Sequence, residues 1–131
     1  MVAMFQFNNL VTSYEANPAP FAFDLLLLQG SRFNRDFWRP VLADLQNEEP
    51  GTGRVVTCEA PLTDVEVFQR FMSTLGLQSV RVVAFAESAS LVAEVQRAKL
   101  GIFSETLLFE QGGPGPKGDE LVRVVREFCG F

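Results

Sequence analysis

Short apolar runs alternate along this chain with segments in which apolar residues recur every three or four positions. Four runs have the length of a strand: FAFDLLLL at 21–28, RVVTCEA at 54–60, SVRVVAFA at 79–86 and ETLLFEQ at 105–111. Continuous apolar runs of this length are typical of strands that are covered on both faces. We therefore predict four strands of one sheet.

The segments between these runs have helical spacing. The first predicted helix lies near 35–47, where Pro40 is tolerated because it falls in the first turns. TDVE at 63–66 predicts a capping box that opens the second helix, with the Thr63 hydroxyl and Glu66 satisfying free N–H groups. Gly76 is typical of the residue that ends such a helix. Two more helices are predicted at 87–99 and near 118–129.

The first twenty residues differ from this pattern. Segments 4–8 and 10–15 predict a short antiparallel hairpin that turns at Asn8 and Asn9, and ANPAP at 16–20 predicts a loop. The resulting order is β-β-β-α-β-α-β-α-β-α. This order predicts a single α/β domain over 1–131, with a mostly parallel sheet of about six strands and helices on both faces.

Composition narrows the classes of function. The chain has 131 residues, of which 47% are hydrophobic and 13 are Phe, and its mean hydropathy is +0.14. So much apolar surface in a small domain favours burial in an oligomer. The net charge is −5 and the sequence contains no basic block, which argues against nucleic acid as a partner.

The counts of histidine and cysteine bear on chemistry. The sequence contains no histidine, which removes the usual general base and the commonest zinc ligand. Cys58 and Cys129 have neither zinc spacing nor a disulfide framework, so we expect two reduced thiols in a cytoplasmic protein. The N-terminus has no signal-peptide pattern and the longest apolar run is too short for a membrane span. We expect no membrane contact and no cofactor.

LLLLQGSRFNRDFW, GRVVTCEAPL and the run from Thr74 to Gln111 follow one another in the chain, and together they resemble the N-terminal half of the α/β-hydrolase superfamily. LLLLQGSRFNRDFW at 25–38 resembles the first core strand with its oxyanion loop, and GRVVTCEAPL at 53–62 resembles the next strand. The segment 74–111 resembles, without a gap, the run from the preceding helix through the nucleophile elbow to the following strand. The resemblance implies an α/β-hydrolase-like three-layer sandwich.

The resemblance places unusual residues at the functional positions. The elbow normally reads Gly-x-Ser-x-Gly, and here the aligned residues are Ala84, Phe85, Ala86, Glu87 and Ser88. Alanine at the nucleophile position has no atom that can attack a carbonyl carbon. Gln29 stands where a histidine commonly precedes the glycine of the oxyanion loop, here Gly30. The remaining triad residues of the family lie beyond the strand that ends near Gln111, so we predict a truncated domain.

Several residues remain candidates for chemistry. Ser88 is the best surviving nucleophile, although no histidine can activate it, and Glu87 is a candidate base at a helix start. Glu59 and Glu110 could join Glu87 in an acidic cluster for a divalent ion. GGPGPKG at 112–118 lies where a phosphate loop would lie but lacks the Walker A pattern. A flexible connection is the simpler interpretation.

The sequence therefore favours a non-catalytic interaction or small-ligand-binding module. The alternative is an ester or thioester hydrolase of unorthodox mechanism that uses Ser88, Glu87 or both. Residues that could line a ligand site are Gln29, Gly30, Phe33, Trp38, Phe85, Ala86 and Glu87.

In the family's strand order, the strand 105–111 becomes an edge that the last helix covers only in part. We predict that self-association as a homodimer covers the rest, or that a partner protein does.

Overall fold

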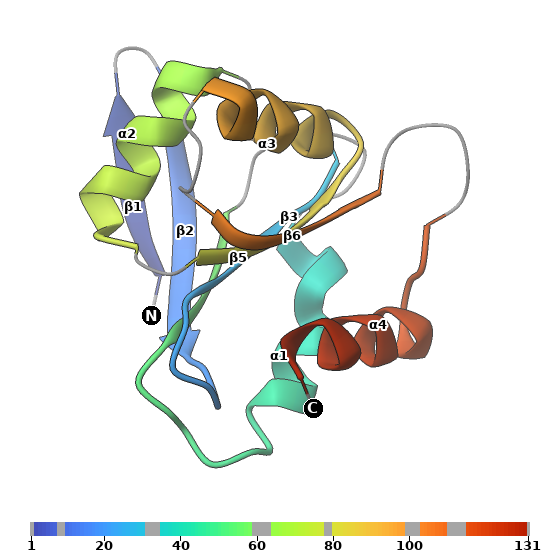
Figure 1. Cartoon of the computed structure of the whole chain (residues 1–131). Coiled ribbons are helices and arrows are strands. Elements are labelled where there is room, and N and C mark those ends of the chain that lie inside the picture. The colour runs from blue at the N-terminus through green and yellow to red at the C-terminus, as the bar shows by residue number, and fades with distance from the viewer. Residues whose placement is uncertain are drawn as a thin grey trace.

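The computed structural model of the chain describes residues 2–7, 10–30, 35–58, 64–77, 80–98, 103–109 and 115–130. These residues form one six-stranded sheet with helices on both sides (Figure 1). The strands are β1 (Val2–Phe7), β2 (Leu10–Pro18), β3 (Leu25–Leu28), β4 (Arg54–Cys58), β5 (Val80–Phe85) and β6 (Phe103–Phe109). The helices are the 3-10 helix η1 (Arg35–Trp38), α1 (Arg39–Leu45), α2 (Val65–Leu75), α3 (Glu87–Ala98) and α4 (Asp119–Cys129).

The strand order in the sheet is β1-β2-β4-β3-β5-β6. β1 pairs antiparallel with β2, and β2 pairs antiparallel with β4, while the pairs of β3 with β4, β3 with β5 and β5 with β6 are parallel. The predicted order of elements and the mostly parallel sheet of about six strands are confirmed. β1 and β6 form the two edges of the described sheet.

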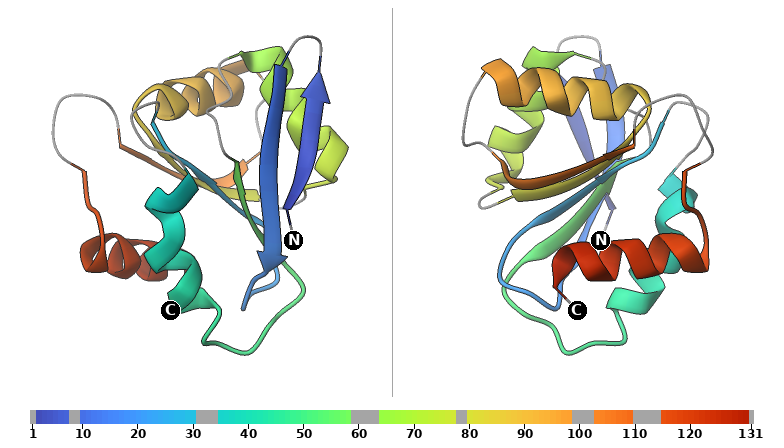
Figure 2. Two further views of the ribbon diagram at one scale, coloured as in Figure 1. Left: turned by 180° about the vertical axis from the view of Figure 1, so that it is seen from behind. Right: turned by 45° about the vertical axis from the view of Figure 1, so that its right-hand side comes forward.

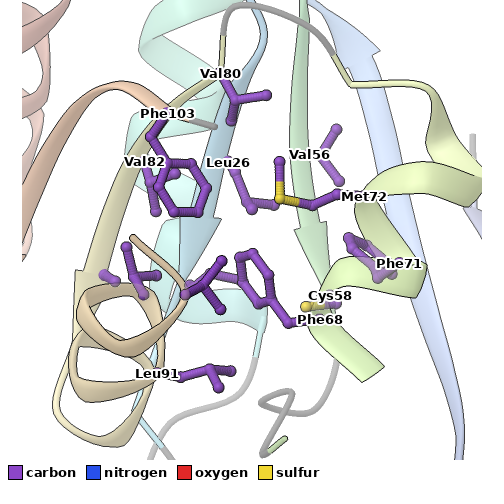
Figure 3. Close-up of a cluster of buried hydrophobic side chains, with 14 of the residues drawn as sticks. Leu26, Val56, Cys58, Phe68, Phe71, Met72, Val80, Val82, Leu91 and Phe103 are labelled. Atoms are coloured by element: carbon purple, nitrogen blue, oxygen red, sulfur yellow. The ribbon is translucent and has the colours of Figure 1, made fainter. Parts of the chain in front are cut away.

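Alternate residues of the central strands enter two different apolar cores. Leu26, Val56 and Val82 face α2 and α3, where they pack with Phe68 and Leu91 (Figure 3). Leu25, Leu27, Val55 and Val83 face the other way and pack with residues of η1, α1 and α4, among them Trp38, Val41, Leu121 and Val125. Figure 2 shows the two helix layers on opposite sides of the sheet. The continuous apolar runs thus result from burial on both faces.

The prediction of a strand over 21–28 is wrong at its start, because β3 begins at Leu25. Residues 19–23 bend instead along the segment before β4, where Ala19 N donates to Gly53 O (2.9 Å) and Gly53 N donates to Phe21 O (2.8 Å). A Cβ at Gly53 would collide with the backbone of Phe23, so glycine permits this approach. The Asp24 side chain then accepts the backbone N–H of Arg54 (3.0 Å) and anchors the bend to β4.

The prediction of a loop over 16–20 is wrong for its first three residues, because β2 continues to Pro18. Its first half pairs with β1, whereas Ala16, Asn17 and Pro18 pair with Val56, Val55 and Arg54 of β4. The pairing of β1 with β2 reaches only Glu15, so within the described residues Pro18 has a strand neighbour on the β4 side alone, as a proline on an edge does. The extension of β2 depends on β4, which begins only at Arg54, after β3 and α1.

The helix boundaries agree with the pattern apart from two differences. The helix predicted near 35–47 consists of the 3-10 helix η1 followed by α1, which ends at Leu45. The N-cap of α2 is Asp64 rather than Thr63, and its Oδ1 accepts the backbone N–H groups of Glu66 (2.7 Å) and Val67 (3.3 Å). Both residue types can cap a helix, and the backbone leaves the helical conformation at Asp64. Gly76 ends α2 with φ 62°, as predicted. No helix within the described ranges is long and apolar enough to cross a membrane.

Candidate functional site

Ala86 forms a sharp turn between β5 and α3. β5 ends at Phe85 and α3 begins at Glu87, and Ala86 between them has φ 55°. It is the one non-glycine residue with positive φ in the part of the chain that the structure describes. Its N–H donates to Phe109 O (2.8 Å), and its carbonyl accepts the N–H of Ser90 (3.2 Å). Ala86 thus forms the sharp, strained turn between strand and helix that the sequence predicted, and its side chain is a methyl group.

The turn lies beside the end of β3. β3 and β5 are parallel neighbours, with Leu28 opposite Ala84, so the residues that follow both strands meet at one edge of the sheet. A Cβ added at Gly30 would lie 3.0 Å from Ala86 Cβ and 3.8 Å from Glu87 Oε1. Gly30, Ala86 and Glu87 are thus close together. Ala86 and Glu87 are partly exposed, and this edge is where α/β sheets bind ligands.

Ser88 lies inside the protein. Its side chain is 1% exposed, and Oγ donates a hydrogen bond of 2.8 Å to the backbone carbonyl of Gln29. A buried hydroxyl with this bond connects α3 to the end of β3. In this arrangement it is oriented toward the protein and away from the tip of the turn, where a substrate carbonyl would have to approach.

Gln29 is buried as well, although the sequence placed it among residues that contact a ligand. Its Nε2 donates to Cys58 O (2.8 Å), and its Oε1 accepts the indole N–H of Trp38 (3.2 Å). The residue is 1% exposed. The structure therefore places Gln29 beneath the site, behind Gly30.

An aromatic cluster flanks the turn on the α1 and α4 side of the sheet. The ring of Phe85 stacks on that of Phe109, with ring centroids 4.5 Å apart. It also forms T-shaped pairs with Phe37 and Trp38, with ring centroids 5.2 Å and 5.7 Å apart. Gly115 approaches the same ring so closely that a Cβ there would lie 2.6 Å from Phe85 Cε2. Phe37 and Phe109 are partly exposed, whereas Trp38 and Phe85 are buried.

Sequence reasoning missed two members of this cluster. Phe109 is the last residue of β6 and pairs in register with Phe85. The predicted strand bounds, 79–86 and 105–111, would have placed position 110 opposite Phe85, so the sequence alone did not give this pair. The sequence contains no signal for Gly115 either, because its contact depends on the path of the loop before α4. Phe33, Glu59 and Glu110 lie outside the described residues, so the predicted acidic cluster is not tested.

Other candidate sites find little support. In the described ranges no group of three His, Cys, Asp or Glu side chains could hold a metal ion. Of GGPGPKG, only residues 115–118 are described, and the helix that follows has Asp119 and Glu120 in its first turn, which disfavours a bound phosphate there.

Cys58 and Cys129 are buried and free of disulfides. Burial raises the pKa of the Cys129 thiol to about 12, with a smaller opposing effect of the positive charge of Arg81. A thiol held neutral in this way is a poor nucleophile at neutral pH.

Comparison with known proteins supports the fold. No protein-family model and no curated protein matches the sequence. Among solved structures, an α/β-hydrolase fold protein from Burkholderia ambifaria has a TM-score of 0.67 at 18% identity, over 98% of this chain and 52% of its own. Two further structures each cover 82% of this chain. Carboxylesterase CesB from Bacillus subtilis has a TM-score of 0.66 at 15% identity. Haloalkane dehalogenase DbeA from Bradyrhizobium elkani has a TM-score of 0.66 at 12% identity.

The matched parts make up 42% of the carboxylesterase and 40% of the dehalogenase. This chain therefore spans about half the length of the solved structures that it resembles. Within that span, the sheet order, the two helix layers and the strained turn after β5 identify its fold as that of the α/β hydrolases.

Proposed function

We propose that this chain is a non-catalytic α/β-hydrolase-like module that binds a ligand or partner and does not hydrolyse it. Ala86 carries the proposal, because it occupies the tip of a turn that in α/β hydrolases presents the nucleophile. Catalysis of acyl transfer by this route needs an attacking atom, and a methyl group has none. The turn keeps its strained backbone, but its side chain can only contact a ligand and cannot react with it.

The surroundings of Ala86 support binding more than chemistry. The nearest hydroxyl along the chain, on Ser88, is buried and donates to Gln29 O. The 131 residues contain no histidine that could activate a hydroxyl. The candidate surface itself combines Ala86 and the partly exposed aromatic side chains of Phe37 and Phe109, with the Glu87 carboxylate beside them and the buried Gly30 behind Ala86. A small, largely apolar ligand fits this composition best.

An ester panel tests the absence of catalysis. Aryl esters of short and medium acyl chains should show no turnover above buffer with the wild-type protein, and a fluorophosphonate probe should not label it. Ser88→Ala should behave as the wild type does. Ala86→Ser should gain little, because the restored hydroxyl has no imidazole partner in this chain. A large gain in ester turnover from that one change would contradict the proposal.

Glu87 favours a second candidate, a hydrolase of unorthodox mechanism. Its carboxylate is partly exposed beside Gly30, at the edge where a substrate would approach, and could act as a base for water. Turnover that Glu87→Gln removes and Ser88→Ala keeps would establish this function in place of the binding one. If Ser88→Ala removed it instead, the serine would be the nucleophile in spite of its burial.

We further propose that the module self-associates through the edge strand β6. Leu107, Leu108 and Phe109 are only partly buried, and β6 pairs with β5 alone among the described strands. Antiparallel pairing about a two-fold axis at Leu107 would place Thr106 opposite the partner's Leu108. The same register would place Glu105 opposite the partner's Phe109, so that the two carboxylates would not face each other.

A further inference from the structure

Gln29 connects four elements of the fold beneath the candidate site. It follows β3 directly, its side-chain amide donates to the last residue of β4, and it accepts a hydrogen bond from η1 through its side-chain oxygen. Its backbone carbonyl accepts a hydrogen bond from Ser88 in the first turn of α3. These three bonds join segments that are separated by 29, 9 and 59 positions in the chain.

The three hydrogen bonds are buried, so the loss of any one of them should destabilise the folded protein. Gln29 and Ser88 are each 1% exposed and Trp38 is 0% exposed. A buried donor or acceptor left without its partner costs more free energy than the bond itself contributes. An apolar side chain at 29 would leave the Trp38 indole N–H and the Cys58 carbonyl without these partners. The amide thus favours one orientation of the indole ring.

The orientation of that ring matters for the candidate site. The Trp38 ring forms T-shaped pairs with Phe37 and Phe85, with ring centroids 5.1 Å and 5.7 Å apart, and Phe85 in turn stacks on Phe109. Phe85 is also the residue immediately before the strained turn at Ala86. A change in the orientation of the Trp38 ring would therefore shift the aromatic cluster beside the turn.

We infer that Gln29 is a positioning residue for the candidate site and does not contact the ligand. Its side chain holds Trp38 against Phe85, and its carbonyl holds the first turn of α3 through Ser88. Together these bonds keep the aromatic cluster and the Ala86 turn in one arrangement. The positioning role stands on the geometry alone, and its effect on a ligand rests on the proposed binding function.

Trp38 is the single tryptophan of the chain, so its fluorescence reports this arrangement directly. In Gln29→Met, a side chain of similar length without the amide, acrylamide should quench Trp38 at least twofold more strongly than in the wild type. The far-ultraviolet circular dichroism should stay the same. Val95→Ala is the control, because Val95 is buried on the opposite face of the sheet. Equal quenching in Gln29→Met and wild type, or an equal rise in the control, would overturn the inference.

A second measurement avoids dependence on the folding of that variant. The indole N–H of Trp38 should exchange with solvent at least tenfold more slowly than that of free tryptophan in the wild type, and Gln29→Glu should retain part of this protection because it keeps an acceptor. Exchange in the wild type at the rate of free tryptophan would overturn the positioning role.

Binding of 1-naphthol separates this inference from the proposed function. Weaker binding by about tenfold in Gln29→Met, with wild-type affinity in Val95→Ala, supports both. If 1-naphthol binds neither protein while Trp38 becomes accessible in Gln29→Met, the positioning role stands and the binding proposal for this ligand class fails. If 1-naphthol binds wild type and Gln29→Met equally, the inferred effect of Gln29 on ligand binding is overturned.

Discussion

The backbone of Ala86 carries a conformation that L-residues other than glycine rarely adopt. With φ 55°, the residue lies in the left-handed region, where a Cβ costs about 1–3 kcal/mol. Neighbouring contacts enforce this conformation: the Ala86 N–H is held by Phe109 O, and Gly30 approaches its methyl group. The turn therefore stores strain at a position with no nucleophile.

Glycine at 86 should relieve this strain. We expect Ala86→Gly to raise the free energy of unfolding by about 0.5–1 kcal/mol, because the gain in the left-handed region exceeds the added entropy of the unfolded chain. Ala93→Gly in the middle of α3 is the matched control and should lower the free energy of unfolding by about 1 kcal/mol. Urea titration of both variants measures the difference. Equal losses in the two would contradict a strained turn.

At the scale of the element, the C-terminal end of helix α4 is hydrogen-bonded to the sheet. The Arg81 guanidinium donates to the carbonyl of Phe128 (3.1 Å) and lies over the ring of Phe23 at 4.0 Å. Cys129 is buried in the same turn, and Gly130 ends the helix with φ 86°. Arg126 pairs on another side with Asp44 (2.8 Å) of α1. The last turn of α4 thus joins the sheet and its neighbouring helix.

The buried thiol should make this turn sensitive to alkaline pH. The pKa of Cys129 is raised to about 12 in the folded protein, chiefly by burial, so the unfolded chain loses this proton first as the pH rises. Its contribution to stability is complete below about pH 9 and decreases between pH 9 and 12, by at most about 1.4 kcal/mol per pH unit.

Urea titrations of the wild type and Cys129→Ala between pH 8 and 11 measure this contribution. Cys129→Ala has no thiol at this position, so its free energy of unfolding should decrease less steeply with pH than that of the wild type. The difference in free energy of unfolding between the two proteins should therefore shrink as the pH rises. A constant difference across that range would show that the folded thiol ionises as readily as the unfolded one.

At the scale of the whole molecule, the sheet ends in two different edges. β1 carries Met4, which is 64% exposed, and β6 carries the partly buried side chains of Leu107, Leu108 and Phe109. α4 shares a core with Leu107 and Phe109 on one face, but it packs beside α1 (Figure 1). An apolar edge of this kind favours pairing with another chain.

Sedimentation velocity at micromolar concentration tests the proposed dimer. The wild type should sediment as a dimer, and Leu108→Lys should sediment as a monomer, because a charged side chain would be buried at the β6 junction. Met4→Lys at the opposite edge is the matched control and should remain a dimer. Circular dichroism must show that both variants are folded. A stable wild-type monomer would contradict association, and a monomer caused only by Met4→Lys would move the junction to β1.

Particular residues show how far the sequence was informative. The apolar runs and glycines such as Gly76 predicted the order of the strands and helices, and the aligned elbow predicted that Ala86 follows β5 at a sharp turn. The start of β3 and the length of β2 were not predicted correctly, and the burial of the Gln29 side chain was not predicted at all. Each depends on a contact with a distant segment: Gly53 with Phe21, Pro18 with Arg54, and Gln29 with Cys58 and Trp38.

The sequence by itself determined the alternation of elements, the two-sided burial of the sheet and the absence of imidazole from this chain. Periodicity and composition can be read from the chain without knowing which distant segments meet. Only the tertiary structure decided that Ser88 is buried, that Gln29 lies beneath the site, and that Phe109 and Gly115 enclose Phe85. These outcomes depend on which side chains meet when strands far apart in the chain are brought side by side. Local patterns do not encode that register, because it is chosen by the packing of the complete core.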